Sequence, residues 1–495
     1  MKMKKIMRST FGRLLCKNWV LAATLLVCGT GSLYAQTEGN TIRALPKVSI
    51  DNLKEAINAD NPVEATITMT YPDETTGGTR EVSYRCLVKY RGGTSISFDK
   101  KSMKIAFLQD QGDGERDVEL PGLGRSDDKC NLDAAAVDRS HFRNRLAMDL
   151  FNSYSPLPYP TAFDGRHGIS GNYVEVWTEG RYSGLYCLTD RVNRKLLGGK
   201  KMKDGEVRGV VYKCSSYDIG CFFYSDGTEP AEGNASWNAW EVKYPNEYPS
   251  YVFNPLRQAM DASWDTVPDE AYNDLVRQYF YWDNLVDVYL LSIVAGLADM
   301  GYKNSYLSCP DYTKDQRFII TPWDMDHSFG ESYRGVPLMD LSTLKGQTNW
   351  INTRPFKRLM ANTESGFLTS LADRWAALRD GLLSVESVTQ RIYDYADLFD
   401  KSGAWQCERE EWNYNPVTLW TTARDGAAYL AEWYQANHAL LDELLLPHQS
   451  TDIKGIVDLP LNTDHPTYDL QGRKVQSSVK KKGIYIHDNK KILTK

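Results

Sequence analysis

The sequence predicts an α+β fold with a β-rich N-terminal lobe, a helical C-terminal lobe and a small β-rich tail. Apolar and polar residues alternate over 45–107, which is typical of half-buried strands. After Ser250 the apolar residues recur mainly at helical spacing, and short strands are expected only near 305–322. Strands and helices therefore occupy different parts of the chain, which argues against a doubly wound sheet.

The first 35 residues have the parts of an export signal. Residues 2–17 carry six Lys or Arg and no acid, an apolar run extends from Trp19 to Cys28, and small residues precede Ala35. The run is too short to span a bilayer, and LLVCG lacks the small residue that lipoprotein processing requires before the cysteine. We therefore expect a signal peptide over 1–35, no later membrane segment, and a secreted, periplasmic or outer-surface protein.

Cleavage at that point would change both the charge and the cysteine count. The six lost cations take the formal net charge from −6 to about −12, which disfavours nucleic acid as a partner. Seven cysteines remain, and a chain of this length can bury a core without disulfides. Cys214 and Cys221 bracket a short loop and are the one local pair that we consider for a disulfide. Buried thiols are expected at the other five positions, Cys86, Cys130, Cys187, Cys309 and Cys407.

The β-rich half contains a glycine loop between two strands. In EVSYRCLVKY (81–90) one face carries apolar side chains, namely Val82, Tyr84, Cys86, Val88 and Tyr90. The loop RGGTSISFDKK (91–101) follows, and its glycines can let backbone amides approach phosphate oxygens, although an ordinary hairpin loop has the same composition. In the next strand Met103, Ile105 and Phe107 face inward, so Lys104 faces outward and Lys101 stands at the strand's start.

Helices are expected in six further stretches. The first covers 138–152, where Asp138 is a candidate N-cap and Arg139 and Arg143 share a face. The others follow the Gly-, Asn- and aromatic-rich segment 215–249, which we interpret as an irregular insertion that shapes substrate access. Their predicted ranges are 254–262, 269–298, 356–378, 385–398 and 419–446.

Three candidate site carboxylates, Asp299, Asp324 and Asp326, lie in the stretch 298–330. The apolar run Tyr281 to Leu297 predicts a buried helix, so Asp299 follows a helix end. Residues 317–322 predict a short strand, and Asp324 and Asp326 would project from one face if that strand continued past Pro322. Mg²⁺ prefers such oxygen ligands, whereas turns also use Asp for purely structural reasons.

Several segments, in this order, resemble the spore-coat CotH kinase family over roughly residues 45 to 445. They are LPKVSI (45–50), YRGGTSISFDKKSMKIAF (90–107), DRSHFRNRLAMDLF (138–151), VEVWTEGRYSGLYCLTDRVNRK (174–195), VYKC (211–214), KNSYL (303–307) and PWDMDHSFG (322–330). That family is similar to atypical protein kinases. The resemblance implies a two-lobed protein-kinase-like fold, ATP and Mg²⁺ as cofactors, and phosphoryl transfer to Ser or Thr of a secreted or envelope protein.

The resemblance also implies roles for individual residues. Asp299 would orient or deprotonate the acceptor hydroxyl, Asp324 would coordinate Mg²⁺ with Asp326 as the alternative ligand, and Asn304 would hold a second ligand position. Contacts to the nucleotide are expected from Lys101, Lys104, Arg143, Lys213 and Lys303. Asp190 stands where the family usually has Glu, one methylene longer, which weighs against a lysine-pairing role there.

Other functions fit parts of the sequence. The 30 tyrosines and 13 tryptophans, clustered at 237–240 and 410–420, are compatible with a glycan- or surface-binding protein, although buried aromatics are commoner. ATP is scarce outside the cytoplasm, so action before or during export, another donor, or a pseudokinase that only binds are alternatives. Kinase-like folds also transfer AMP or ligate amino acids.

The last segment, 447–495, changes character. A polar linker leads to TYDLQGRKVQSSVKKKGIYIHDNKKILTK, which resembles the short C-terminal sorting tails of secreted Gram-negative proteins. A small β appendage on the main domain is the alternative. The predicted organisation is a signal peptide over 1–35, a CotH kinase-like domain over 36–446 and a β-rich tail over 447–495.

Overall fold

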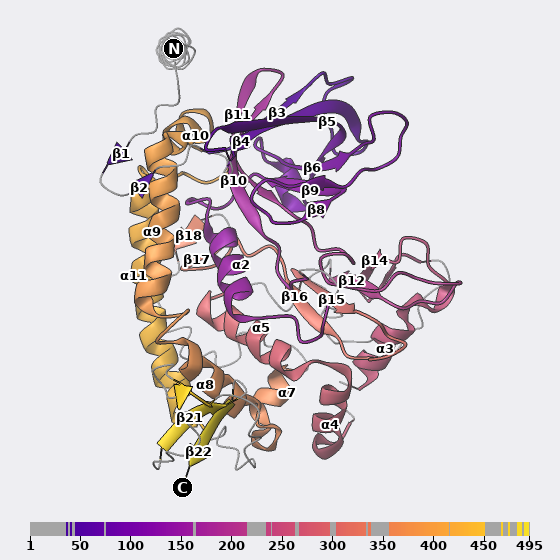
Figure 1. Ribbon diagram of the computed structural model, residues 1–495, viewed down its shortest axis with the longest axis vertical. Helices are drawn as coiled ribbons and strands as arrows, with labels where there is room; N and C mark the ends of the chain where they lie inside the picture. Colours follow the sequence, from indigo (N-terminus) through magenta and orange to yellow (C-terminus); the bar gives the residue numbers. More distant parts are fainter. Residues whose placement is uncertain are drawn as a thin grey trace, which may run out of the picture.

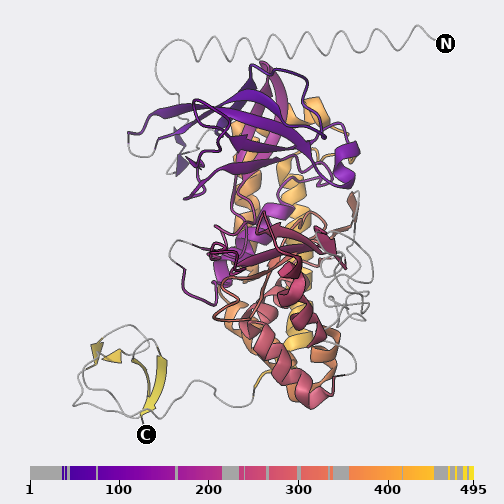
Figure 2. The ribbon, with the colours of Figure 1, turned by 90° about the vertical axis from the view of Figure 1, so that its right-hand side faces the viewer.

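The computed structural model describes most of the chain between residues 45 and 450. The described ranges are 45–73, 76–161, 165–214, 234–238, 240–262, 267–297, 303–332, 335–337, 356–414 and 416–450, with short strands at 36–37, 40–41, 467–468, 474–475, 483–487 and 490–494. The predicted signal peptide, residues 215–233 of the insertion predicted at 215–249, and Asp299 lie outside these residues. The described part of that insertion is not irregular, because it contains strands β13 (Ser236–Trp237) and β14 (Trp240–Tyr244). Figures 1 and 2 show a barrel at one end, helices at the other, and a second sheet between them.

Seven strands form a closed barrel in the order β10-β11-β9-β6-β5-β4-β3. Neighbouring strands are antiparallel except where β10 closes the barrel parallel to β3. Their bounds are β3 Lys47–Asp51, β4 Val63–Pro72, β5 Thr79–Arg91, β6 Ser102–Phe107, β9 Lys129–Asp133, β10 Gly171–Thr178 and β11 Arg181–Thr189. The alternation predicted for β5 and β6 is confirmed, because Cys86, Val88, Met103, Ile105 and Phe107 all lie in the barrel core.

Short elements join the barrel to the rest of the chain. The 3-10 turn η1 (Thr94–Ser97) lies within the glycine loop, and β7 (Val118–Glu119) pairs with β8 (Ser126–Asp127). Helix α2 spans Arg143–Tyr154, so it begins five residues after the predicted N-cap. The predicted N-cap is wrong, because Phe142 is the N-cap residue, although the Asp138 carboxylate accepts the Arg143 amide at 2.8 Å. Arg139 lies before the helix.

A second, five-stranded antiparallel sheet has the order β13-β14-β12-β15-β16. Its strands are β12 Val210–Cys214, β13 Ser236–Trp237, β14 Trp240–Tyr244, β15 Ser305–Cys309 and β16 Ile319–Pro322. Buried helix α5 (Trp282–Val294) is tied to β16 by Asn284, whose side chain bonds both the amide and the carbonyl of Ile320. The predicted buried helix before the carboxylates is thereby confirmed.

The C-terminal part is helical, with two predicted helices broken. An extended segment at Phe280 separates α4 (Asp269–Tyr279) from α5, because Tyr281 donates its amide to the carbonyl of Phe318. Gly366, with φ +69°, separates α7 (Phe356–Ala361) from α8 (Phe367–Leu378). The remaining helices are α3 (Asn254–Asp261), α9 (Val385–Ser402), α10 (Ala404–Trp412), which was not predicted, and α11 (Ala423–Leu445).

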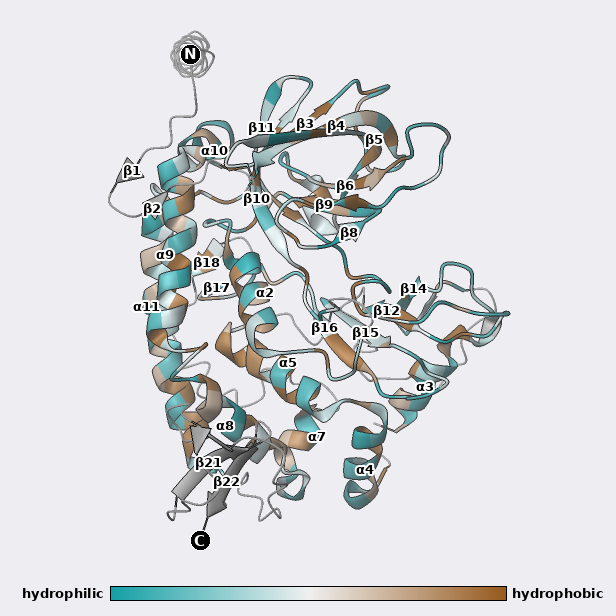
Figure 3. Cartoon of the chain, in the orientation of Figure 1, coloured by the Kyte–Doolittle hydropathy of each residue, from teal (hydrophilic) through white to brown (hydrophobic). Residues whose placement is uncertain are grey.

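Helices α9 and α11 form a long pair that runs beside both the barrel and the other helices (Figure 1). Figure 3 shows hydrophobic and hydrophilic residues alternating along them, as expected for amphipathic helices. A capping box at Thr422 and Asp425 defines the start of α11. Among the described residues, we find no helix with both the length and the apolar character that a bilayer span requires.

The barrel and the helical part each have a hydrophobic core. Mixed α and β structure is confirmed, and the β-rich half takes the form of a closed barrel, which was not predicted. Four short strands in the tail form an antiparallel sheet, namely β19 Thr467–Tyr468, β20 Lys474–Val475, β21 Gly483–His487 and β22 Lys490–Thr494. The tail therefore contains β structure, as predicted. Two pairs of short strands are β1 (Gln36–Thr37) with β2 (Asn40–Thr41) and β17 (Glu331–Ser332) with β18 (Val336–Pro337). Three further 3-10 helices are η2 (Ser250–Phe253), η4 (Thr363–Ser365) and η5 (Leu446–His448).

Candidate functional site

A cleft of about 410 Å³ lies where the barrel faces the second sheet. The barrel side contributes Arg91, Gly92, Gly93, Ser95, Lys100, Ser102, Asp133 and Thr189. The opposite side contributes Lys213, Glu241, Lys303, Asn304, Trp323, Asp324 and Asp326. Five of the predicted site residues, Lys213, Lys303, Asn304, Asp324 and Asp326, are therefore brought together.

The Asp324 loop departs from the expected geometry. Strand β16 ends at Pro322, and Asp324 adopts a left-handed backbone with φ +63°, so the predicted alternation past the strand end is wrong. Asn304, with φ +62°, accepts the Trp323 amide on its carbonyl at 3.0 Å. Its side-chain amide donates to the carbonyl of Asp324 at 3.4 Å. Two non-glycine residues in the left-handed region thus face each other where two strands end, which is typical of functional sites.

The start of α2 holds the same loop from behind. Asn144 accepts the Met325 amide on its Oδ1 at 3.2 Å, and Arg143 Nε donates to the carbonyl of Ser328 at 3.0 Å. Arg143 is fully buried and forms ion pairs with Asp138 at 2.5 Å and Glu331 at 3.0 Å. Arg143 does not line the cleft. It braces two acids and the loop backbone.

Two cations approach the same aromatic ring at the cleft. Arg91, at the end of β5, lies 5.4 Å from the centre of the Trp323 ring, and Lys213, on β12, lies 5.8 Å from it. Burial lowers the pKa of Lys213, Arg91 lowers it further, and Asp324 acts in the opposite direction. The negative charge of Asp324, the proposed cation ligand, therefore acts on the pKa of Lys213 and favours its protonated form.

The glycine loop can bring its backbone close to a ligand. Gly92 has φ +143°, and a Cβ there would lie 2.2 Å from Ser95 Oγ, so only glycine fits. A Cβ at Gly93 would meet no atom within 4 Å, which leaves the backbone of this cleft-lining residue open to a ligand.

The other two predicted lysines do not line the cleft. Lys101 donates to the carbonyl of Phe98 at 2.5 Å and lies 5.7 Å from the centre of the Tyr90 ring. Lys104 lies on the outer face of β6 directly opposite Lys89. Its pKa is lowered to about 8, first by burial and then by Arg191, Lys129 and Lys89. The structure supplies no nucleotide-facing position for either lysine.

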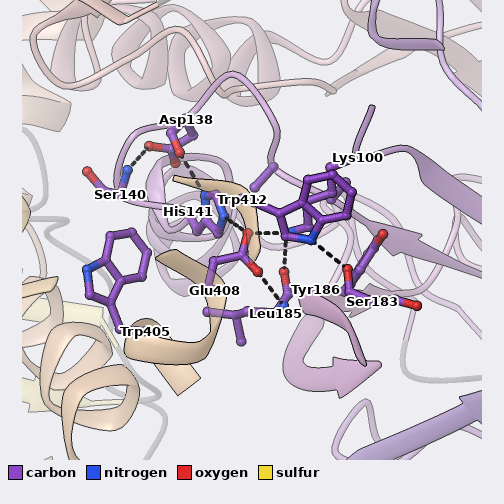
Figure 4. A network of polar contacts seen from close by, with 12 residues as sticks. Lys100, Asp138, Ser140, His141, Ser183, Leu185, Tyr186, Trp405, Glu408 and Trp412 are labelled. Carbon is purple, nitrogen blue, oxygen red and sulfur yellow. Dashed lines mark hydrogen bonds and ion pairs between the residues drawn. The ribbon is translucent and has the colours of Figure 1, made fainter. Parts of the chain in front are cut away.

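A lysine–carboxylate pair does exist, at Lys100. Figure 4 shows its ammonium group held by Glu408 of α10 at 2.6 Å and by the carbonyl of Leu185 at 2.7 Å. His141 Nε2 contacts the same Glu408 oxygen at 2.8 Å, and the Leu185 amide donates to the other oxygen at 2.7 Å. This buried group, Lys100, His141 and Glu408, ties β11, α10 and the segment before α2 into one junction.

Both ring nitrogens of His141 face acceptors. Nδ1 lies 2.7 Å from the carbonyl oxygen of Asp138, and Nε2 faces the Glu408 carboxylate, which also accepts from Lys100. A carbonyl and a carboxylate cannot donate, so both nitrogens must carry protons for both bonds to form.

Asp190 takes no part in lysine pairing. Its carboxylate accepts the Ser170 amide at 2.9 Å and lies 3.6 Å from Arg125 and 3.7 Å from Arg166. Burial raises its pKa to about 6, although both arginines oppose that rise. The shorter side chain of Asp190 had argued against a lysine-pairing role, and these contacts agree with that expectation.

Four residues of the cleft were missed by sequence reasoning: Arg91, Asp133, Asn144 and Glu241. Arg91 and Asn144 stand next to residues that had been considered, the glycine loop and Arg143. Asp133 and Glu241 lie at strand positions with no distinguishing pattern, and only the tertiary fold brings them to the cleft.

The oxygen atoms of Asp324, Asp326 and Asn304 suit a hard divalent cation, and they line one cleft with lysines beside them. In the described part of the chain, no group of three or more His, Cys, Asp or Glu side chains is arranged to hold a metal ion. The donor set fits a cation that is also held by ligand oxygens, as Mg²⁺ is by nucleotide phosphates.

The tryptophans of the aromatic clusters are buried or half-buried, but Tyr414 of the second cluster is 74% exposed. Trp237 and Trp240 are buried, as is Trp405, while Trp412 and Trp420 are half-buried. This weighs against glycan stacking on these tryptophans, because stacking on a sugar needs an exposed ring, whereas the ring of Tyr414 is exposed. Free thiols are found at Cys86, Cys130, Cys187, Cys309 and Cys407. The Cys214–Cys221 disulfide stays a prediction, because Cys221 lies outside the described residues.

A cleft lined by a glycine loop, lysines and a D-x-D pair is the kind of site that binds an anionic ligand together with a hard cation. The family model described as CotH kinase protein matches residues 88–441, which is more than half of the chain. The protein therefore belongs to the CotH kinase family, and this membership indicates a kinase or other phosphotransferase. No individual curated protein matches the chain.

Proposed function

We propose that the protein transfers the γ-phosphoryl group of ATP to a Ser or Thr hydroxyl of a secreted or envelope protein, within a kinase-like two-lobed fold. The cleft is the observation that carries this proposal, because it unites Asp324, Asp326, Asn304 and Lys213 opposite the glycine loop. Family membership supports the reaction class. The proposed location rests on the N-terminal export signal and on the tail.

In the proposed reaction the acceptor oxygen attacks the γ-phosphorus, the bond to the β-phosphate oxygen breaks, and ADP leaves. Asp299 orients the acceptor hydroxyl and takes its proton. Lys213 and Lys303 offset the negative charge of the phosphates, and backbone amides of the glycine loop approach their oxygens. Mg²⁺, held by Asp324 with Asp326 and Asn304, would supply charge neutralisation across the β- and γ-phosphates.

The test is Mg²⁺-dependent stabilisation by ATP. Residues 36–495 should gain roughly 2.7 kcal/mol of stability at 100 times the Kd, and Asp324→Asn should abolish the Mg²⁺-dependent gain, because the amide lacks the charge that the cation needs. Asp110→Asn is the matched control, since the Asp110 side chain is exposed, pairs with Arg116 and does not line the cleft. Thermal shift and ³²P transfer to envelope extracts are measured side by side.

The outcomes separate the alternatives. Full activity of Asp324→Asn would leave Asp326 as the cation ligand. Stabilisation by glycans without any effect of ATP would replace the kinase proposal by a glycan-binding one. ATP binding without transfer would favour a pseudokinase, and labelling by the α-phosphate of ATP would indicate AMP transfer.

A further inference from the structure

Asn144 connects the two sides of the cleft. It lies in the first turn of α2 and lines the cleft. Its Nδ2 donates to Asp133 Oδ2 at 3.0 Å, and its Oδ1 accepts the Met325 amide at 3.2 Å. A carboxylate can only accept and a backbone amide can only donate, so both contacts need one donor and one acceptor on the same short side chain. Asparagine meets that requirement.

Asp133 is held in place by the barrel. Its Oδ1 accepts from Ser102 Oγ at 3.2 Å and from the Ala135 amide at 3.3 Å. Ser102 Oγ in turn accepts the Ala134 amide at 2.9 Å. Because these contacts occupy one oxygen of Asp133, the other oxygen faces Asn144 and determines which way its amide points.

Met325 lies between the two carboxylates proposed to bind the cation. Its side chain is fully buried, and strand pairing has already ended at Pro322, so Asn144 supplies the acceptor for its amide. Because Met325 lies between Asp324 and Asp326, fixing its backbone amide limits the directions in which both aspartate side chains can point. The left-handed backbone of Asp324, a conformation that needs support, lies directly beside this contact.

We propose that Asn144 is a positioning residue that orients Asp324 and Asp326 toward a divalent cation, and that Asp133 determines the orientation of its amide. The inference rests on the proposed function in that it assumes a cation with nucleotide at the Asp324 loop. Cation affinity thereby depends on a barrel residue that does not itself need to touch the cation.

The test exchanges the two side chains. Asn144→Asp keeps an acceptor for Met325 but loses the donor to Asp133 and places two carboxylates together. We expect a 10- to 100-fold weaker affinity for Mn²⁺ in the presence of a non-hydrolysable ATP analogue, as is typical when partners of metal ligands are removed. The double variant Asp133→Asn with Asn144→Asp restores one donor and one acceptor at unchanged net charge. Its affinity should return to within about threefold of the starting protein.

Mn²⁺ binding is followed by electron paramagnetic resonance and calorimetry on residues 36–495, so the readout does not depend on turnover. Asn152→Asp is the matched control, because Asn152 lies on the same helix and also donates and accepts, to Ile169 and from Gly168. It should leave the Mn²⁺ affinity unchanged. Thermal melts verify that each variant folds, and if Asn144→Asp does not, Asp133→Asn alone is compared with the double variant.

Unchanged Mn²⁺ affinity in folded Asn144→Asp would overturn the proposal while leaving the proposed function intact. A double variant no better than the single ones would overturn the role of Asp133. If the starting protein bound no Mn²⁺ with nucleotide, the proposed function itself would fail, and the cation role of Asn144 with it.

Discussion

Two lysines that line the cleft, Lys100 and Lys213, meet carboxylates and aromatic rings in different ways. At the junction of Lys100, His141 and Glu408 the ammonium group contacts a carboxylate and a carbonyl, and it lies 4.6 Å from the centre of the Tyr186 ring. The side chains of Lys100 and Glu408 are at most 1% exposed. At the cleft Lys213 lies over Trp323 and, within the described residues, forms no ion pair.

This contrast separates a structural charge from one available to a ligand. Lys100 donates to Leu185 and Glu408 and pairs its charge with that carboxylate, so its charge is already offset inside the protein. A lysine held over an aromatic ring beside carboxylates can still contact an anion. Variants at the junction should therefore change stability, whereas variants at the cleft should change binding or turnover with stability preserved.

Glu408→Ala should have the largest effect. It leaves Lys100 and His141 buried without their carboxylate, which typically costs about 3–5 kcal/mol of unfolding free energy. Denaturant unfolding measures the loss, and Glu411→Ala, on the exposed side of the same helix, should stay within about 0.5 kcal/mol. A loss below 1 kcal/mol at Glu408 would show that the junction is not the stabilising contact that its burial indicates.

The same pair has a defined pH window. Burial alone would raise the pKa of Glu408, but Lys100 and His141 lower it from its ordinary 4.5 to about 2. A depressed acid pKa stabilises the fold above pH 4.5 and loses that contribution as the pH falls toward 2. The stability difference between the native protein and Glu408→Gln should therefore be constant above pH 4.5 and shrink below it.

Asp299→Ala should have the next largest effect and the opposite signature. If Asp299 takes the acceptor proton, phosphorylation should fall by roughly 10²-fold while the Kd for ATP stays within a few-fold. Filter binding and initial rates measure the two quantities. Loss of ATP binding would assign Asp299 to the cation site, and unfolding would show that it is a structural turn residue.

Lys101→Ala should have almost no effect, because Lys101 belongs to neither place. Its ammonium group contacts the Phe98 carbonyl at the surface of the loop, so stability should change by less than about 0.5 kcal/mol and the Kd for ATP should stay the same. Lys213→Met is the comparison and should weaken ATP binding. If Lys101→Ala bound ATP tenfold more weakly, the phosphate contact that the sequence predicts for Lys101 would be supported. The distinction between Lys101 and the cleft lysine Lys213 would then be wrong.

Local sequence patterns predicted several elements of the fold. Period-two alternation correctly identified the inner faces of β5 and β6, and the apolar run before Asp299 correctly predicted α5. Barrel closure was beyond such patterns, because β3 pairs with β10 more than a hundred residues later. The break at Phe280 was also hidden, since it depends on a backbone contact to Phe318 and not on a Gly or Pro.

The site divides in the same way. Asp324 and Asp326 could be found because their spacing and neighbours are local, and Lys213 because it stands at a strand end. Adjacent Lys100 and Lys101 could not be told apart, since what distinguishes them is Glu408, 308 positions away. Asn144 was overlooked because one partner, Met325, lies 181 positions away, and the other, Asp133, lies on a strand 11 positions before it.

Barrel closure has a consequence for the order in which the protein can fold. The pairing of β3 with β10 needs residues 47–51 and 171–178 together, so no closed barrel can exist until about a third of the chain has been made. The ion pair between Lys100 and Glu408 can form only after α10, near the end of the helical part, has been made. Contacts this distant in sequence are slow to form, because the entropy of closing a long loop is lost before any bond is gained. A growing chain therefore cannot close the barrel, or form the contact between Lys100 and Glu408, before these later segments have been made.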